Sequence, residues 1–238
     1  MSETIRQKFK SEKESVGVVL LGTFNNLMFH PHWFEKQGVL GHDEIADVLR
    51  RKDQMICAPG LTTFHTSQLI IKVEDYRFEI RAMKEPFGVV LDAYKKTFEG
   101  LESITVTAMG INTSAHFKMP DITTYHKFGD LLAPKDRWKK FLGSDVSGDD
   151  RKGGLSLLSM TRTKPDGKGA RTVKVERSRE YSLPAVGIFV DGNDHFAFQS
   201  ESNKFGIDAS EAMEILSQNF ETTQKDFREF REALFLGL

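Results

Sequence analysis

The sequence has one cysteine, no hydrophobic run long enough to span a membrane, and no excess of charge of either sign. A lone Cys57 excludes a disulfide framework and any zinc site built from several cysteines, which fits a reducing cytoplasm. The longest aliphatic run, Val16 to Leu21, is far too short for a transmembrane helix, and no apolar signal segment follows Met1. With 33 basic and 34 acidic residues, no global field attracts polyanions or membranes. We therefore expect a cytoplasmic protein without membrane contact.

The signatures of common catalytic and nucleotide-binding sites are also missing. The chain has no Gly-x-Ser-x-Gly nucleophile elbow, no Gly-x-x-x-x-Gly-Lys-Ser/Thr phosphate loop and no Gly-x-Gly-x-x-Gly dinucleotide motif. Cys57 stands between Ile56 and Ala58, an apolar setting typical of an inert buried thiol. The sequence therefore predicts no cofactor and leans against catalysis.

Composition and pattern predict a folded α+β protein. Of 238 residues, 39% are hydrophobic and 19 are phenylalanine, enough for a large core. The charged residues 1–14 are expected to form a flexible arm. Residues 15–118 show the order β-α-β-β-α-β of a ferredoxin-like half. Its predicted strands cover 16–22, 62–73, 76–83 and 104–113, and its predicted helices cover 42–50 and 85–98.

Residues 119–238 are predicted to form a second α+β half packed on the first, or to continue it as one domain. A glycine-rich loop over 143–154 separates two helices from a largely antiparallel set of strands. A capping box of Asp208 and Glu211 begins a long C-terminal helix. The predicted helices before the loop are 120–132 and 135–142, and the strands after it are 155–162, 171–179 and 186–200, the last one broken at 191–194.

Polar residues follow several apolar strands, most clearly after the β-branched run that begins at Ile104. Gly22-Thr-Phe-Asn25, Gly110-Ile-Asn112 and Gly192-Asn193 resemble one another, which either a duplicated ancestor or chance explains. The candidate polar cluster consists of Asn25, His30, His32, Asn112, His116, Asn193 and His195.

The histidines of this cluster define a candidate metal site. Neutral imidazoles suit zinc or iron, and Asp191 or Asp194 can supply a carboxylate. A metal-dependent hydrolase or nuclease would use His30, His32, His116 and His195 with these acids. Against it, Pro31 disturbs the spacing of the first two histidines, and Asn and His at strand ends more often satisfy backbone groups in turns.

Charge is unevenly distributed along the second half. Residues 151–180 contain nine basic and three acidic residues, and residues 201–238 have a net charge of −4. A basic hairpin can grip a nucleic-acid backbone or an acidic protein, or lean on the acidic C-terminal helix of its own chain or of a second subunit. The hairpin lacks the interleaved aromatics that favour single-strand stacking. The candidate contact residues are Arg162, Lys164, Lys168, Arg171, Lys174, Arg177 and Arg179.

The C-terminal helix carries an apolar stripe that skips Thr223. Such a stripe either packs across the sheet or pairs with a partner helix, and fewer than four heptads favour the sheet. The stripe consists of Met213, Leu216, Phe220, Phe227, Phe230 and Leu234.

Four segments carry a family resemblance: 22–34, Gly110-Ile-Asn112, 131–134 and Asn193-Asp-His195. They resemble a group of uncharacterised, sporadically distributed bacterial proteins without assigned activity. The resemblance implies a bacterial source and supplies no catalytic residue.

The interpretation that fits these features best is a non-catalytic interaction or sensor subunit of a bacterial multiprotein assembly. Its partner would be another protein or a second copy of the chain. A metal-dependent hydrolase or nuclease and a nucleic-acid-binding protein are the alternatives.

Overall fold

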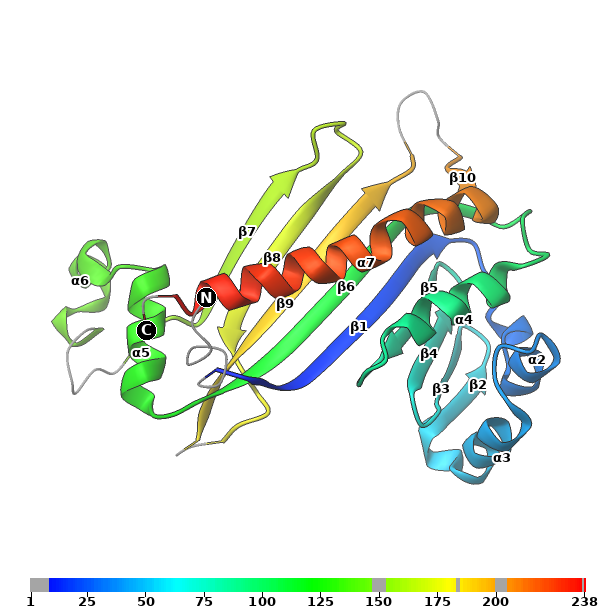
Figure 1. The fold of residues 1–238 in the computed structure, drawn as a ribbon, viewed down its shortest axis with the longest axis horizontal. Coiled ribbons are helices and arrows are strands. Elements are labelled where there is room, and N and C mark those ends of the chain that lie inside the picture. Colours follow the sequence, from blue (N-terminus) through cyan, green and yellow to red (C-terminus); the bar gives the residue numbers. More distant parts are fainter. Residues whose placement is uncertain (1–8, 147–152, 183–184, 200–204, 237) are drawn as a thin grey trace.

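All the strands that the structure describes belong to one antiparallel sheet. The structure is a computed structural model that describes residues 9–146, 153–182, 185–199, 205–236 and 238. The sheet has ten strands in the order β2-β3-β4-β5-β1-β6-β9-β8-β7, with β10 beside β6 (Figure 1). The strands are β1 (Ser11–Gly22), β2 (Met55–Ala58), β3 (Leu61–His65), β4 (Leu69–Glu74), β5 (Arg77–Ala82), β6 (Thr105–Met119), β7 (Leu157–Thr163), β8 (Gly169–Arg177), β9 (Val186–Ala197) and β10 (Ile207–Asp208).

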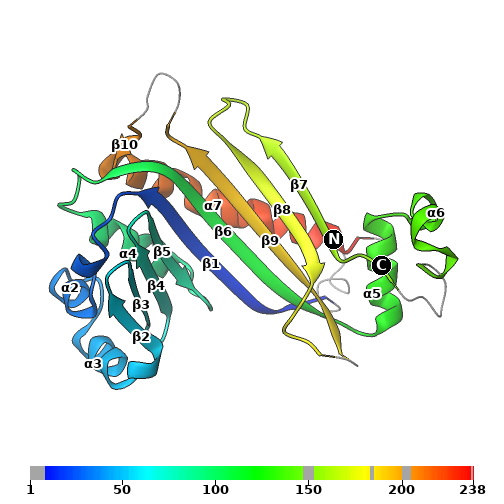
Figure 2. The same ribbon diagram turned by 180° about the vertical axis from the view of Figure 1, so that it is seen from behind.

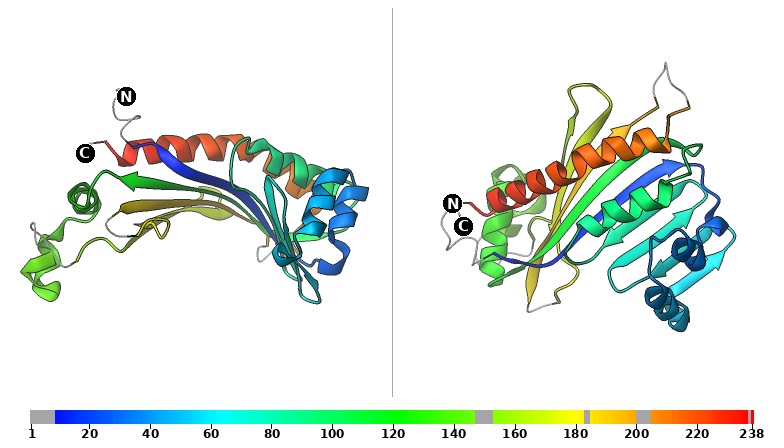
Figure 3. Two further views of the ribbon diagram at one scale, coloured as in Figure 1. Left: turned by 90° about the horizontal axis from the view of Figure 1, so that it is seen from below. Right: turned by 45° about the vertical axis from the view of Figure 1, so that its right-hand side comes forward.

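The long helices lie on one face of this sheet. Helix α7 (Ala209–Leu234) packs on β6 and β9 and runs beside α4 (Gly88–Phe98). Helices α2 (Pro31–Lys36) and α3 (His42–Arg50) pack against the β2–β5 end, whereas α5 (Ile122–Leu132) and α6 (Lys139–Leu142) lie at the other end of the molecule (Figures 1 and 2). Across the opposite face no described helix lies (Figure 3). None of the described helices is long and apolar enough to cross a membrane.

Side-chain alternation along the strands decides which residues meet the helices. On β1, Val16, Val18 and Leu20 point to the helix side and are buried. Tyr94 of α4 donates its hydroxyl hydrogen to the Val18 carbonyl at 2.6 Å and accepts from the Ile80 N–H at 3.2 Å. These bonds satisfy a fully buried phenol and fix α4 on β1 and β5.

Helix α7 joins two hydrophobic clusters. Leu216 and Phe220 belong to the larger cluster, which fills the space under α2, α3 and α4. Phe227 belongs to the smaller one, which β6, β9 and α5 also line. In that cluster Phe9 stacks on Phe235 with 4.9 Å between ring centroids. The apolar stripe therefore packs on the sheet of its own chain and is not an exposed helix interface. Its buried members are Met213, Leu216, Phe220 and Phe227. Phe230 and Leu234 are partly buried and pack against the smaller cluster.

Most predicted elements are confirmed. Helix α3 has the predicted bounds 42–50, and Asp208 caps α7 by accepting from the Glu211 N–H at 2.9 Å. The predicted strand 62–73 is wrong as one strand: Thr66 Oγ1 accepts from the Leu69 N–H at 2.9 Å and closes a turn between β3 and β4. The short β2 was not expected. Residues 1–8 of the expected arm and 147–152 of the expected loop lie outside the described residues, and Ser11–Glu14 belong to β1.

Two expected strand ends are wrong as well. The strand β6 continues through Asn112 and His116 to Met119, and β9 runs unbroken through 191–194. Asn112 and His116 of β6 and Asp191 and Asn193 of β9 alternate with residues that face the helices, so they occupy the helix-free face while each strand goes on. Asp194 faces α7 instead. Gly192 sits where a Cβ would approach Phe227 to 2.6 Å, which explains a glycine inside β9.

The described elements repeat one order. A strand, a helical segment, several more strands and a helix occur first as β1, α2–α3, β2–β5 and α4, and again as β6, α5–α6, β7–β9 and α7. β1 and β6 lie antiparallel at the centre, and the remaining strands except β10 follow outward on both sides. The two-residue β10, which precedes α7, pairs with β6 and has no counterpart before α4. The sequence echo does not mark this repeat, because Gly22 ends β1 and pairs with Val106, whereas Gly110 lies inside β6 and pairs with Val19.

Candidate functional site

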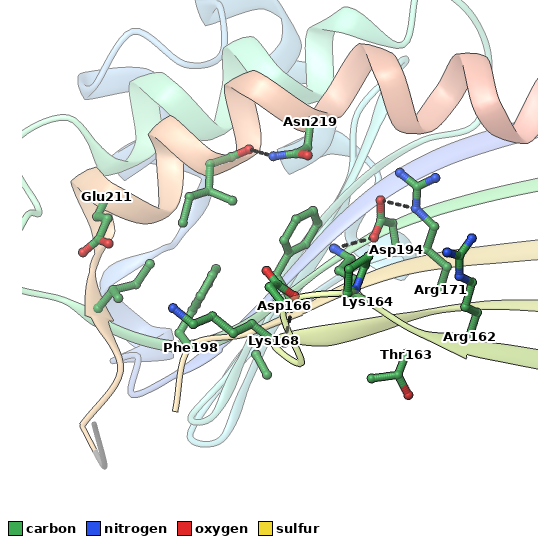
Figure 4. A pocket seen from close by; sticks show the side chains of 15 residues that line it. Arg162, Thr163, Lys164, Asp166, Lys168, Arg171, Asp194, Phe198, Glu211 and Asn219 are labelled. Carbon is green, nitrogen blue, oxygen red and sulfur yellow. Dashed lines mark hydrogen bonds and ion pairs between the residues drawn. The ribbon is translucent and has the colours of Figure 1, made fainter. Parts of the chain in front are cut away.

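A groove of about 870 Å³ lies between the β7–β8 hairpin, the end of β9 and the first turns of α7 (Figure 4). Cations form its hairpin wall, apolar side chains form its floor, and polar side chains of α7 border it. The cations are Arg162, Lys164, Lys168 and Arg171. The apolar side chains are Phe196, Phe198, Ile207 and Ile215. The polar side chains of α7 are Glu211 and Asn219.

Turn chemistry places the cations around the groove. The Gly167 N–H donates to the Lys164 carbonyl at 2.9 Å, and Gly167 has a φ of +69°, a conformation that glycine adopts without strain. At Gly169, which also has positive φ, a Cβ would lie 2.1 Å from the His195 carbonyl oxygen. The Pro165-Asp166-Gly167 run therefore folds a tight tip that carries Lys164 and Lys168.

Asp194 is the buried acid of this site, with 3% of its surface exposed. Its Oδ1 lies 2.6 Å from Lys164 Nζ, and its Oδ2 accepts from Arg171 Nε at 3.0 Å and from Thr223 Oγ1 at 2.9 Å. Arg171 also donates to Asp226 of α7 at 2.7 Å. Burial lowers the pKa of Lys164, while its contact with Asp194 opposes that shift. The basic hairpin thus contacts the acidic C-terminal helix of its own chain through the ion pair of Arg171 and Asp226.

Two cations of the wall remain available to a ligand. Arg162 and Lys168 are exposed, and within the described residues neither has an ion-pair partner. Lys164 Nζ lies 3.0 Å from the centre of the Phe196 ring, so the buried ion pair rests directly on the aromatic floor. The groove therefore offers free positive charge at its mouth and apolar contact area beneath it. That combination can bind an anionic group attached to an apolar one.

The four histidines of the expected metal site do not share a location. His30 and His32 lie at the start of α2, and His32 contacts Glu35 at 3.1 Å. His116 pairs with Phe189 and His195 with Gly110, six positions apart along β6, which is about 20 Å at 3.3 Å per residue. No group of three His, Cys, Asp or Glu residues placed to hold a metal ion occurs in the part of the chain that the structure describes.

Two of the expected polar residues bond to each other on the helix-free face, and a third lies beside them. Asn193 Nδ2 donates to Asn112 Oδ1 at 2.9 Å, and the two residues are direct cross-strand partners. His195 lies opposite Gly110, next to this pair. Asp191 also lies on this face, where burial raises the pKa of its carboxyl and Arg81 and Lys174 oppose the rise. Asp191 and Asp194 therefore serve opposite faces of β9.

At the end of β1, the structural hydrogen bonds are made by Asn26 and not by the expected residue Asn25. Asn25 is exposed and makes no side-chain cap bond. Asn26 is buried, donates to the Ala58 carbonyl at 2.8 Å and accepts from the Gly60 N–H at 3.1 Å. An asparagine that satisfies backbone groups in turns is therefore present here, one position later than Asn25.

His116 has a serine partner that the sequence did not reveal. His116 Nδ1 lies 2.8 Å from Ser178 Oγ, and burial lowers the pKa of the imidazole. Ser178 is 1% exposed and its oxygen also accepts from the Glu180 N–H at 3.2 Å. A buried hydroxyl with this bonding cannot meet a substrate, so the pair supports the turn after β8.

Cys57 is exposed on the edge strand β2, which corrects the expectation of a buried thiol. Partial burial still raises the pKa of its thiol, against a hydrogen bond from Thr62. The edge position explains the difference, because an apolar neighbour sequence does not determine whether a strand is central.

Sequence reasoning missed Thr223, Asp226 and the aromatic floor of the groove. The gap at Thr223 in the apolar stripe was a usable signal, since a polar residue on a buried helix face needs a buried polar partner. Phe196 and Phe198 gave no signal of their own in the sequence. The chain matches no protein-family model and no curated protein.

Proposed function

We propose that this chain is a non-catalytic interaction subunit that binds an acidic segment of a partner protein in the groove between the β7–β8 hairpin and α7. The observation that carries the proposal is the pair Arg162 and Lys168, exposed and without ion-pair partners among the described residues, above the apolar floor of Phe196 and Phe198. Rim charges steer and orient a partner, and apolar contacts under them supply affinity.

The acids of the groove favour a protein segment over a nucleic acid. Asp166 and Glu211 line the same groove as Arg162 and Lys168. A phosphate backbone presents regularly spaced negative charge and would meet these acids, whereas a peptide can place its own acids selectively. The apolar floor lies below the exposed Arg162 and Lys168, and it suits an apolar peptide side chain better than a sugar-phosphate chain.

Binding also fits the groove better than hydrolysis. Both carboxylate oxygens of Asp194 are engaged by Lys164, Arg171 and Thr223. A general base must reach the substrate, whereas Asp194 is 3% exposed and its charge is neutralised by two cations of its own chain. The candidate metal ligands are distributed over separate parts of the fold, so a metal-dependent hydrolase has less support.

We also propose that β4, β5, β1 and β6 with their connecting helices form a ferredoxin-like unit. Their neighbour order β4-β5-β1-β6, in which consecutive strands pair antiparallel, supports it. A bacterial source remains part of the proposal, on the resemblance of segments 22–34, Gly110-Ile-Asn112, 131–134 and Asn193-Asp-His195. The charged hairpin beside the groove suits a subunit of a multiprotein assembly.

The test is a selection of random twelve-residue peptides by display on the purified full chain, followed by anisotropy titration of the enriched peptides. We expect acidic peptides whose affinity falls with added salt and drops about tenfold, or about 1.4 kcal/mol, in the variant Arg162→Glu/Lys168→Glu. The matched control is Lys84→Glu/Lys118→Glu, which reverses two exposed lysines outside the groove and should leave the affinity unchanged. Enrichment of neutral or basic peptides, or equal loss in both variants, would refute the proposed function.

A further inference from the structure

The strand β7 is an edge of the sheet. It pairs with β8 over all seven residues, and the described residues include no strand on its other side. Figures 1 and 2 show it as the outermost strand on its side, beyond β8. Its last two residues, Arg162 and Thr163, line the groove. A free edge presents unpaired N–H and C=O groups to any extended chain that approaches it.

The hydrogen-bond register shows which backbone groups are free. The Lys164 N–H donates to the Gly169 carbonyl at 3.0 Å. Bonded pairs alternate in an antiparallel ladder, so Arg162–Arg171, Met160–Val173 and Leu158–Val175 are the bonded pairs of β7 and β8. The N–H and C=O groups that point away from β8 therefore belong to Leu157, Ser159, Thr161 and Thr163.

The two edges of this sheet are built differently. β2, the other edge, has four residues and is followed by Pro59, and both features protect an edge from pairing. β7 has seven residues, no proline and no break in its register with β8. Its Met160 is 70% exposed and its Leu157 is 52% exposed. Natural edges seldom leave such a strand uncovered unless something pairs with it.

We propose that the acidic partner segment binds as an added β-strand along β7, with alternate side chains directed into the groove. This inference rests on the proposed function and adds the mode of recognition. Met160 and Arg162 point to the same face as the groove, so the segment would place an apolar side chain beside Met160 and an acidic one beside Arg162. Main-chain bonds to Ser159 and Thr161 would supply affinity, and these side chains would supply specificity.

Charge selects this occupant over a second copy of the chain. Residues 157–177 contain six basic and two acidic residues, so pairing two copies of β7 would bring two hairpins of net charge +4 together. An acidic segment instead neutralises Arg162 and Lys168, which have no ion-pair partner in the described part of the chain.

The experiment uses an acidic peptide from the display selection and three proteins: wild type, Thr161→Pro and Thr161→Val. Proline at 161 removes an outward N–H and no β7–β8 bond, whereas both variants lose the 2.9 Å contact between the hydroxyls of Thr161 and Thr172. We expect about a tenfold loss of affinity for Thr161→Pro and less than about twofold for Thr161→Val. Circular dichroism and thermal midpoints confirm that both variants fold.

A second measurement leaves the protein unchanged. With the wild-type protein, N-methylation of those alternate peptide residues whose N–H groups face β7 should abolish binding. In the complex with the unmodified peptide, the amides of Ser159, Thr161 and Thr163 should gain protection from hydrogen exchange. If Arg162→Glu/Lys168→Glu weakens binding while N-methylation and Thr161→Pro do not, strand addition is refuted and the proposed function stands. If the charge variant has no effect, the proposed function fails. A concentration-dependent dimer that Thr161→Pro dissociates would instead assign the edge to a second copy.

Discussion

Asp194 on β9 accepts a hydrogen bond from Thr223 on α7, with 2.9 Å between Oδ2 and Oγ1, at the gap in the apolar stripe of that helix. The same carboxylate holds Lys164 and Arg171 of the hairpin. One buried acid therefore ties three elements together: the central sheet, the crossing helix and the basic hairpin.

Replacing Asp194 with alanine should destabilise the protein by about 3 kcal/mol, because Lys164 would keep a largely buried charge without its partner. Urea unfolding at pH 7 measures the change. Asp226→Ala is the control, since Asp226 contacts the same arginine but 43% of its side chain is exposed, and it should cost less than about 1 kcal/mol. Equal effects of the two substitutions would show that burial of Asp194 does not decide the energetics.

Gly192→Ala should cost about 1–3 kcal/mol, because the new methyl group would lie 2.6 Å from Cδ2 of Phe227. The loss should shrink in the double variant Gly192→Ala/Phe227→Leu relative to Phe227→Leu alone. Gly88→Ala is the matched control, since the residue begins a helix and, apart from its chain neighbours and the backbone of its own helix, no described atom lies within 4 Å of the position that a methyl group would take there. Thermal unfolding distinguishes the two, and an unaffected Gly192→Ala would contradict the close packing of β9 against α7.

Acidification should weaken the fold through His116. Burial lowers the pKa of its imidazole, with Glu180 opposing and Lys13 adding to the shift. Below about pH 6.5 the unfolded chain takes up a proton that the folded chain resists, so stability falls as the pH decreases. Denaturant midpoints between pH 7.5 and 5.5 should therefore drop less in His116→Gln than in wild type. Equal losses in the two proteins would contradict this role of His116.

Cys57 should react with maleimide in the native protein, because it is exposed on β2. Its rate at pH 7 should be lower than that of a free thiol, since partial burial raises the pKa of Cys57, and the rate should rise about tenfold for each pH unit between 7 and 8.5. Mass spectrometry of intact protein follows the labelling. A thiol that reacts only after denaturation would contradict its position on an open edge.

Much of the secondary structure was predictable from local pattern. The period of apolar residues and a capping acid are local signals, and they placed α3 over 42–50 and began α7 after Asp208. The prediction is wrong where polar residues alternate with apolar ones. The sequence predicts that Asn112 and His116 follow the end of a strand, but they share the helix-free face of β6, which continues to Met119. The period of two was present through Phe117 and outweighs residue type.

The candidate site was predictable only in part. The sequence identified Lys164, Lys168 and Arg171 as one basic group, since they are close along the chain. It treated Asp194 as a metal ligand, because its real partners Lys164 and Thr223 lie about 30 positions before and after it. Contacts of that range depend on sheet order, which no local pattern contains.

The position of α7 has a consequence for synthesis on the ribosome. Residues 213–220 complete the cluster that the strands and helices of residues 16–111 begin, and residues 227–235 complete the other. A nascent chain that has emerged only to β9 therefore exposes the sheet face that α7 later covers. We expect the protein to become protease-resistant in one late step rather than half by half.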